Sequence, residues 1–154
     1  MKINGDFWKT IWLDKNCCVN VIDQTLLPHK LETKKLTNGN DAYLAIKNMI
    51  VRGAPLIGVT GAYGLALSIK DDQSDSNLEN NFYLLKSARP TAVNLSWALE
   101  RVYKKIIKCK LEQRFEEAIK EANLIAEEDI KMCSNIGENG STILKEIYLK
   151  KKLG

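Results

Sequence analysis

Residues 51–67 have the sequence VRGAPLIGVTGAYGLAL. The weakly polar stretch from Ala54 to Ile69 is shorter than the ~20 residues that span a bilayer, and we expect a buried helix from about Leu56 to Ile69. Three glycines recur within it, Gly58, Gly61 and Gly64, and their spacing is typical of a helix that packs closely against its neighbours. We therefore interpret this segment as the core helix of the fold and expect no membrane span.

Arg52 and Gly53 stand immediately before this helix, with Pro55 in its first turn. A helix start offers unpaired N–H groups and a positive dipole potential, and both favour an anion. Gly53 lets the backbone approach a ligand closely, and Arg52 adds a forked donor that suits phosphate. The segment is neither a P-loop nor a Rossmann fingerprint. The residues alone therefore leave Arg52 open between an anion ligand and an ordinary surface arginine.

A second arginine, Arg89, also precedes a proline at an expected helix start. Pro90 is predicted to open this helix, because a proline in the first turn costs no hydrogen bond. Apolar residues then recur at helical spacing and define one buried face: Leu95, Ala98, Leu99, Val102 and Ile106. Two such arrangements in one small domain suggest two basic anchors for an anionic ligand, and a phosphate dianion suits both.

Strands are expected at the front of the chain. Phe7–Leu13 and Cys17–Ile22 are rich in aromatic and β-branched residues and flank the turn Asp14–Asn16, so they predict a β-hairpin. Residues 24–36 are expected to connect this hairpin to the helices.

Helices are expected over most of the remaining chain. One begins near Thr37 or Asn38, either of which is able to cap it, and a short one covers Leu78–Lys86. The longest covers Leu111–Ser134 and stops at Gly137. The expected inward residues of the first and the longest helix are Ala42, Ala45, Ile46, Met49 and Ile50, and Phe115, Ala118, Ile119, Ala122, Ile125, Ala126 and Ile130.

The predicted fold class is α+β and mostly α-helical, with an N-terminal β-hairpin followed by a helical bundle. We expect residues 1–36 to form the hairpin and connecting segment, and residues 37–136 to form the helical domain. Residues 137–154 are expected to lead toward a further domain. If that domain covers the glycine-rich helix, the chain alone exposes an apolar patch and tends to associate.

Composition and charge favour an ordinary globular protein. The 154 residues carry a net charge of 23 − 19 = +4, and the lysines are scattered except at Lys150–Lys152, which we expect to be solvated. A nucleic-acid binder would show a dense basic stripe with aromatics, so no nucleic-acid partner is expected. The four cysteines have no zinc spacing, and no signal peptide precedes them, which together favour a reduced, cytoplasmic protein without a metal.

Several segments resemble the methylthioribose-1-phosphate isomerases. These enzymes belong to a family that also includes proteins similar to translation initiation factor 2B alpha. The blocks that carry the resemblance are Val51–Pro55 with Ala62–Ala66, and Arg89–Leu95 with Trp97-Ala98-Leu99. Thr10–Asp14 and Ile22–Pro28 also fit, and Gly137-Glu138-Asn139-Gly140 is similar to the Gly-Glu-His-Gly turn of these proteins, with Asn139 in place of histidine. The resemblance extends over essentially the whole chain and identifies it as an N-terminal portion.

The resemblance implies an aldose–ketose isomerase that converts 5-methylthioribose 1-phosphate to 5-methylthioribulose 1-phosphate in methionine salvage, without a cofactor. It also implies that Arg52, Gly53, Ala54 and Arg89 contact this sugar phosphate, Arg89 through the phosphate. In these proteins a Rossmann-like domain follows and carries the catalytic cysteine and aspartate. Neither position falls within residues 1–154, so we expect no catalytic residue in this chain and no activity of the chain alone. Two protein partners stay open, a polypeptide with the C-terminal domain and a second copy of the chain.

Two other functions remain open from sequence. One is a non-catalytic interaction module related to the regulatory subunits of a translation-initiation exchange factor. The other is a different sugar-phosphate isomerase, such as a ribose-1,5-bisphosphate isomerase. Cys133 precedes the Gly-Glu motif instead of following it, so we interpret it as a packed thiol at a helix end. His29 is interpreted as a structural loop residue, and Asp23 and Asp41 as turn or capping residues.

Overall fold

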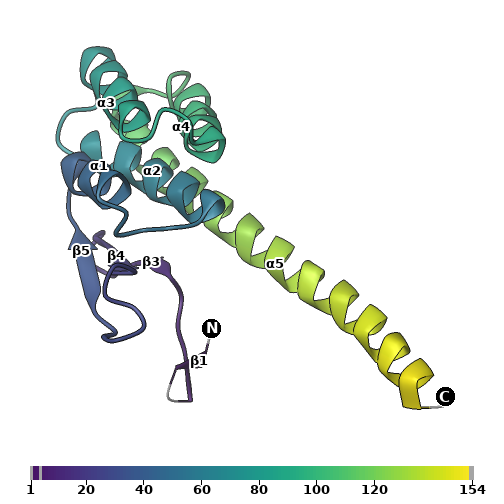
Figure 1. The fold of residues 1–154 in the computed structure, drawn as a ribbon. Helices are drawn as coiled ribbons and strands as arrows, with labels where there is room; N and C mark the ends of the chain where they lie inside the picture. The colour runs from purple at the N-terminus through teal and green to yellow at the C-terminus, as the bar shows by residue number, and fades with distance from the viewer. Residues whose placement is uncertain (1, 4, 153–154) are drawn as a thin grey trace.

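The computed structural model describes residues 2–3 and 5–152, and it confirms a mostly helical fold with strands at the N-terminal side. Figure 1 shows these strands beside a group of helices, and one long helix that extends away from both. The elements are β1 Lys2–Ile3, β2 Asp6–Phe7, β3 Ile11–Leu13, β4 Val19–Ile22, β5 Thr33–Leu36, α1 Gly39–Lys47, α2 Ala54–Ser68, α3 Asp75–Ser87, α4 Val93–Ile106 and α5 Arg114–Lys152, the last preceded by a 3₁₀ turn at Leu111–Gln113. Within the described residues, no helix is long and apolar enough to cross a membrane.

The expected hairpin is formed by β3 and β4, which pair antiparallel with Ile11 opposite Val21. The carboxylate of Asp14 holds the turn because it accepts hydrogen bonds from the backbone N–H groups of Asn16 and Cys18. These bonds, the one from Cys18 foremost, lower the pKa of Asp14 to about 2. The predicted strand Phe7–Leu13 was too long. Strand structure is interrupted between β2 and β3, and Phe7 belongs to β2, where it pairs with Lys2.

The third strand of this sheet, β5, lies in the stretch that the sequence predicted to be a connection. It pairs antiparallel with β4, with Leu36 opposite Val19. Leu36 is fully buried, whereas Thr33, Lys34 and Lys35 are exposed at the edge of the sheet. Because only one of its four residues is buried, β5 lacks the alternation by which a half-buried strand is recognised.

The helix α1 begins as predicted. The side chain of Asn38 accepts a hydrogen bond from the backbone N–H of Asp41, and the Asp41 carboxylate accepts one from the backbone N–H of Thr37. Together these bonds form a cap at the helix start. Met49 does not belong to the buried face, because it follows the helix at a positive φ of 57° and is 43% exposed.

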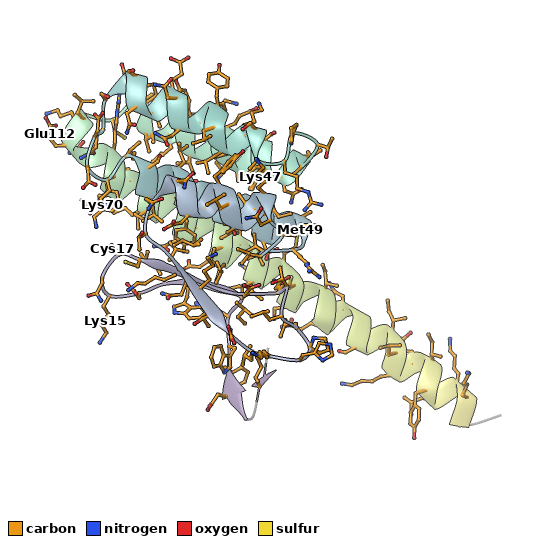
Figure 2. The ribbon with its side chains drawn as sticks, turned by 60° about the vertical axis from the view of Figure 1, so that its left-hand side comes forward. Lys15, Cys17, Lys47, Met49, Lys70 and Glu112 are labelled. Atoms are coloured by element: carbon orange, nitrogen blue, oxygen red, sulfur yellow. The ribbon has the colours of Figure 1, made fainter. Side chains whose placement is uncertain are left out.

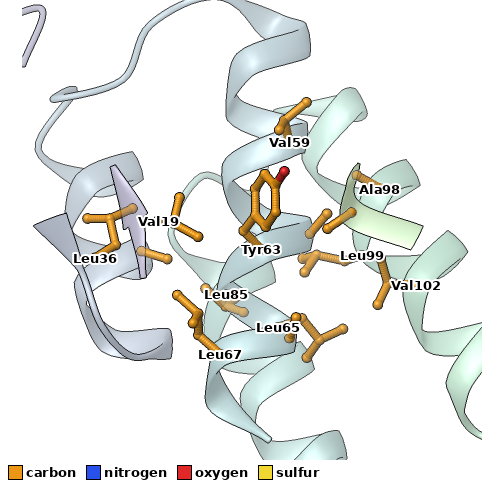
Figure 3. Close-up of a cluster of buried hydrophobic side chains, with 14 of the residues drawn as sticks. Val19, Leu36, Val59, Tyr63, Leu65, Leu67, Leu85, Ala98, Leu99 and Val102 are labelled. Carbon is orange, nitrogen blue, oxygen red and sulfur yellow. The ribbon is translucent and has the colours of Figure 1, made fainter. Parts of the chain in front are cut away.

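The glycine-rich helix α2 forms the centre of the core. Every residue from Leu56 to Leu67 is buried, and the helix packs against α1, α3, α4 and α5. Figure 3 shows part of this core, with Tyr63 and Leu65 of α2 near Leu85 of α3 and Leu99 of α4. The glycines make this possible: a Cβ on Gly64 would lie 2.6 Å from the Cβ of Ala42, and one on Gly58 would lie 2.8 Å from the backbone oxygen of Asn94. Elements of this same chain therefore cover α2, and no further domain is needed to bury it.

The starts of α3 and α4 differ from the prediction. Ser74 caps α3, which begins at Asp75, three residues before the predicted start. Pro90 does not open α4, because residues 89–92 form a turn in which the N–H of Ala92 donates to the carbonyl oxygen of Arg89. The helix then begins at Val93, and its five predicted core residues are all fully buried.

The long helix α5 does not stop at Gly137 but continues to Lys152. Its first half packs on α2 and α4 and buries Ala118, Ala122 and Ile125, whereas Ile130 is half exposed and not an inward residue. From residue 131 to 151 nearly every side chain is exposed, and Figure 1 shows this part projecting from the body. Residues 153–154 lie outside the described residues, and the division at 136/137 stays a prediction.

Candidate functional site

The segment Arg52-Gly53-Ala54 forms the start of α2. Gly53 has a positive φ of 101°, a conformation that L side chains rarely adopt, and a Cβ placed on it would have nothing within 4 Å. No described side chain caps the helix here, so its first N–H groups have no side-chain acceptor. Arg52 is exposed, and its Nε donates a long hydrogen bond of 3.3 Å to the carbonyl oxygen of Met49, a residue labelled in Figure 2.

Arg89 lies in the turn before α4 and is partly buried. The helix α4 also begins without a side-chain cap. In this respect α2 and α4 differ from α1 and α3, which are capped by Asn38 and Ser74. Among α1 to α4, the two helices whose starts lack a side-chain cap are therefore the two that follow an arginine.

The two arginines stand at the same end of the fold. The helices α2 and α4 contact each other near their starts, where a Cβ on Gly58 would lie 2.8 Å from the backbone oxygen of Asn94. Gly58 is the fifth residue of α2 and Asn94 is the second of α4. Because both helices begin beside this crossing, their positive dipole ends act on the same region.

The described residues of this chain form no ion pair with the two arginines of this region. Arg101 pairs with Glu121 and Glu128, and Arg114 pairs with Asp75. Neither Arg52 nor Arg89 forms an ion pair with any described residue. Two of the four arginines thus keep their charge available, and they are the two that the sequence singled out.

A hollow of about 340 Å³ lies beside the crossing of α2 and α4. Its walls come from α2, α4 and α5: Pro55, Gly58, Val59, Val93, Asn94, Trp97, Ile125, Glu128, Asp129 and Met132. A larger hollow of about 500 Å³ lies between the N-terminal segment, α2 and α5 and does not involve α4. The four predicted site residues line neither hollow; Ala54 adjoins Pro55 at the edge of the smaller one.

Comparison with known proteins shows the family to which this chain belongs. Residues 50–149 match the model of a family described as the initiation factor 2 subunit family, which is more than half of the chain. This chain belongs to the initiation factor 2 subunit family. The matched range includes both arginines and all of α2 and α4.

Within this family, the chain is similar to methylthioribose-1-phosphate isomerases. It is 47% identical over 152 residues to that of Methylorubrum populi, and 43% identical over 155 residues to that of Escherichia coli. These alignments cover 98% and 100% of the chain, but only 42% of either relative. The resemblance predicted from the motifs is thereby confirmed.

Two solved structures of the family share the fold. One is 5-methylthioribose 1-phosphate isomerase from Pyrococcus horikoshii, with a TM-score of 0.71 and 35% identity over 77% of this chain and 36% of that one. The other is the delta subunit of the translation initiation factor eIF-2B from A. fulgidus, with a TM-score of 0.69 and 38% identity over 79% of this chain and 37% of that one. Both an enzyme and an initiation factor subunit thus have this arrangement of helices.

The residues set aside from the sequence fall outside the arginine-bearing helix starts. Cys133 is not packed at a helix end; it lies within α5, is exposed, and lines the larger hollow. His29 is exposed in the loop before β5, and Asp23 accepts hydrogen bonds from Thr25 in a turn. Among the described residues, no group of three or more histidine, cysteine or acidic side chains is arranged to hold a metal ion.

Sequence reasoning missed the walls of the smaller hollow. Trp97 was noticed only as part of a motif, and Asp129 and Met132 not at all. One signal was available in the sequence. Trp97 is apolar but does not share the helical spacing of the buried face formed by Leu95, Ala98 and Leu99, which indicates a side chain that faces solvent or a ligand. Asp129 and Met132 give no such signal, because only the fold brings α5 beside α4.

Proposed function

We propose that this chain supplies the phosphate-binding part of an aldose–ketose isomerase site that acts on 5-methylthioribose 1-phosphate. Arg52, Gly53, Ala54 and Arg89 contact the substrate, and the two guanidinium groups bind the phosphate. The chain spans about 42% of the length of the curated relatives it matches, so the reaction itself is part of this proposal.

One observation carries the proposal. Two arginines without a carboxylate partner among the described residues stand before two touching helices that both lack a side-chain cap. A phosphate dianion would satisfy these groups together, through forked hydrogen bonds and the helix N–H groups. The positive φ and open surroundings of Gly53 leave the backbone accessible to such a ligand.

The reaction explains why a firm phosphate site is needed. The phosphate blocks the anomeric oxygen of the sugar, so the ring must open while this group stays bound. A hydrogen then moves between C2 and C1, which requires the carbon chain to be held in one orientation. We assign this holding role to the chain and the hydrogen transfer to groups outside residues 1–154.

The alternative function is an interaction module without catalysis, and the similarity to the eIF-2B delta subunit favours it. Such a module has no requirement for two unpaired arginines at one end of the fold. Binding of the sugar phosphate therefore distinguishes the two functions.

The test is a titration of the chain with 5-methylthioribose 1-phosphate, followed by amide chemical shifts. We expect saturable shifts at residues 52–54 and near Arg89, and at least a tenfold loss of affinity in Arg52→Ala, since hydrogen bonds to a charged group contribute about 1.5–3 kcal/mol. Lys70→Ala is the matched control, because Lys70 is an exposed cation just beyond the opposite end of α2 (Figure 2). No binding, or equal losses in both variants, would refute the proposed site.

Turnover is measured in the same preparation. We expect none from the chain alone, and activity after mixing with the separately expressed remainder of the Methylorubrum populi relative. Turnover by the chain alone would show that hydrogen-transferring groups lie within residues 1–154. Binding without activity on mixing would retain the phosphate site and remove the assignment of this chain as part of an isomerase.

A further inference from the structure

We propose that the smaller hollow, between α2, α4 and α5, receives the methylthio end of the sugar phosphate, and that Trp97 is the residue that selects it. This inference rests on the proposed function and extends it from the phosphate end of the substrate to the other end.

The position of the hollow fits the length of the substrate. Phosphate and sulfur are carried on C1 and C5, at opposite ends of a five-carbon chain. Gly58, which lines the hollow, lies four residues into α2 from Ala54, or about 6 Å along the helix axis. On α4, Trp97 lies four residues beyond Val93, the first residue of that helix, and both line the hollow. A ligand held by the phosphate at the helix starts therefore points its far end along both helices into this space.

The walls of the hollow suit a thioether. Val93, Trp97 and Met132 are apolar and all are exposed in the chain as it stands, Trp97 by 49%. Sulfur is polarisable and packs favourably against aromatic rings, so a methylthio group gains from Trp97 more than a hydroxyl would. A volume of about 340 Å³ is at the lower end of the ~300–1,000 Å³ found for small-molecule pockets.

Trp97 is held in place before any ligand arrives. The guanidinium carbon of Arg101 lies 5.4 Å from the centre of the Trp97 ring, within range of a cation–π contact. Arg101 is itself fixed to α5, because its Nε donates to Glu121 at 2.6 Å and its Nη2 donates to Glu128 at 2.8 Å. Because these contacts already restrict the Trp97 ring, the ring loses less side-chain entropy when a ligand binds.

The charge of the hollow argues against a second phosphate at C5. Glu128 is neutralised by Arg101, but Asp129 forms no ion pair with another described side chain. A phosphate on C5 would face the Asp129 carboxylate, whereas an uncharged thioether would not. The hollow thus favours 5-methylthioribose 1-phosphate over ribose 1,5-bisphosphate.

The experiment compares two ligands that share the phosphate end. Dissociation constants of 5-methylthioribose 1-phosphate and ribose 1-phosphate are measured by amide and indole chemical shifts for the full chain and its variants. We expect the wild type to prefer the methylthio ligand about tenfold or more, as one apolar group in a fitted pocket provides. Trp97→Ala should remove most of this preference and change the affinity for ribose 1-phosphate less than twofold.

Two further variants separate selection from general damage. Val93→Ser changes a wall residue that is 79% exposed, so it leaves the fold intact and should lower the preference partially. Tyr83→Ala removes an exposed aromatic ring on α3 that does not line the hollow, and should leave the preference unchanged. Ribose 1,5-bisphosphate should bind more weakly than ribose 1-phosphate, and Asp129→Asn should reduce that difference.

The outcomes distinguish this inference from the proposed function. If both ligands bind the wild type equally, or if Trp97→Ala keeps the preference, the methylthio pocket is refuted and the phosphate site stands. Arg52→Ala should weaken both ligands alike and keep their ratio. If neither ligand binds the wild type, the phosphate site is refuted and the pocket with it.

Discussion

The helix α2 and the second half of α5, residues 131–151, are both long helical stretches with many apolar side chains, but they have opposite environments. From Leu56 to Leu67 α2 is buried on all sides, whereas residues 131–151 of α5 are exposed apart from a half-buried Gly140. Glycines mark the difference: those of α2 lie against neighbouring elements, while a Cβ on Gly137 or Gly140 would meet nothing within 4 Å. The same residue type thus permits close packing in one helix and only weakens the other.

The largest expected effect is on the free energy of unfolding when a leucine of α2 is truncated, compared with the same truncation in the second half of α5. Leu65 is fully buried in α2, and Leu65→Ala should lower the free energy of unfolding by about 2–5 kcal/mol. Leu144 is 68% exposed in α5, and Leu144→Ala should change it by less than about 0.5 kcal/mol. Urea unfolding of both variants measures this. A large loss in Leu144→Ala would mean that another surface covers α5 in solution.

A smaller effect is expected when a methyl group is added to α2. Gly64→Ala would place a Cβ 2.6 Å from that of Ala42, which is attached to the backbone of α1 and has no rotamer by which to move away. Overpacking of this kind costs about 1–3 kcal/mol. The unfolding free energy should fall by that amount, and an unchanged value would show that α1 shifts away from α2 without cost.

Tyr63 reports on the contact between α2 and the first half of α5. Its hydroxyl donates a 2.6 Å hydrogen bond to Asn123, and burial, with a smaller contribution from Glu127, raises its pKa to about 12. The pKa of Tyr63 in the folded protein lies above the ordinary value of about 10, so the folded state favours the protonated hydroxyl. The stability that this proton contributes is present below pH 10 and is lost as the pH rises toward 12. Unfolding free energies at pH 9 and 11 should differ more in the wild type than in Tyr63→Phe. The control variant Tyr83→Phe should behave like the wild type.

Removing Tyr63's hydroxyl also has an effect at neutral pH. Tyr63→Phe should cost about 0.5–1.5 kcal/mol, since one hydrogen bond to a partly buried amide is lost. A variant as stable as the wild type would show that water replaces Asn123 as a partner at no cost.

The smallest effect has the opposite sign and lies in the second half of α5. Gly137→Ala should stabilise this part of the helix by up to about 1 kcal/mol, because alanine loses less backbone freedom and meets no neighbour. Hydrogen exchange of amides 131–150 measures this local stability directly. Faster exchange in the variant would show that Gly137 makes a close contact in solution.

The sequence predicted those parts of the fold that follow from local patterns. The α4 face from Leu95 to Ile106 and the Asn38 cap were found because periodicity and capping are local properties. The strand β5 was missed because two of its four residues are exposed lysines and its pairing with β4 is tertiary. Gly137 misled the prediction because a glycine ends a helix only when the chain turns there, and here it continues.

The candidate site was predictable to a similar extent. The arginines were evident from their positions before helices, but the distance between the two helix starts depends on the contact of Gly58 with Asn94. The hollow beside them depends on α5, which brings Asp129 and Met132 from more than thirty residues away along the chain. Those contacts arise from packing and leave no mark on a single sequence.

The unbroken length of α5 also restricts how this protein is able to change during evolution. Its 39 residues form one rod of about 58 Å. One residue inserted between Met132 and Gly140 would rotate Leu144 by about 100° around the helix axis and advance it by about 1.5 Å. Loops absorb such insertions, but a continuous helix transmits them to everything beyond. Homologues should therefore tolerate substitutions in this helix far more readily than changes in its length.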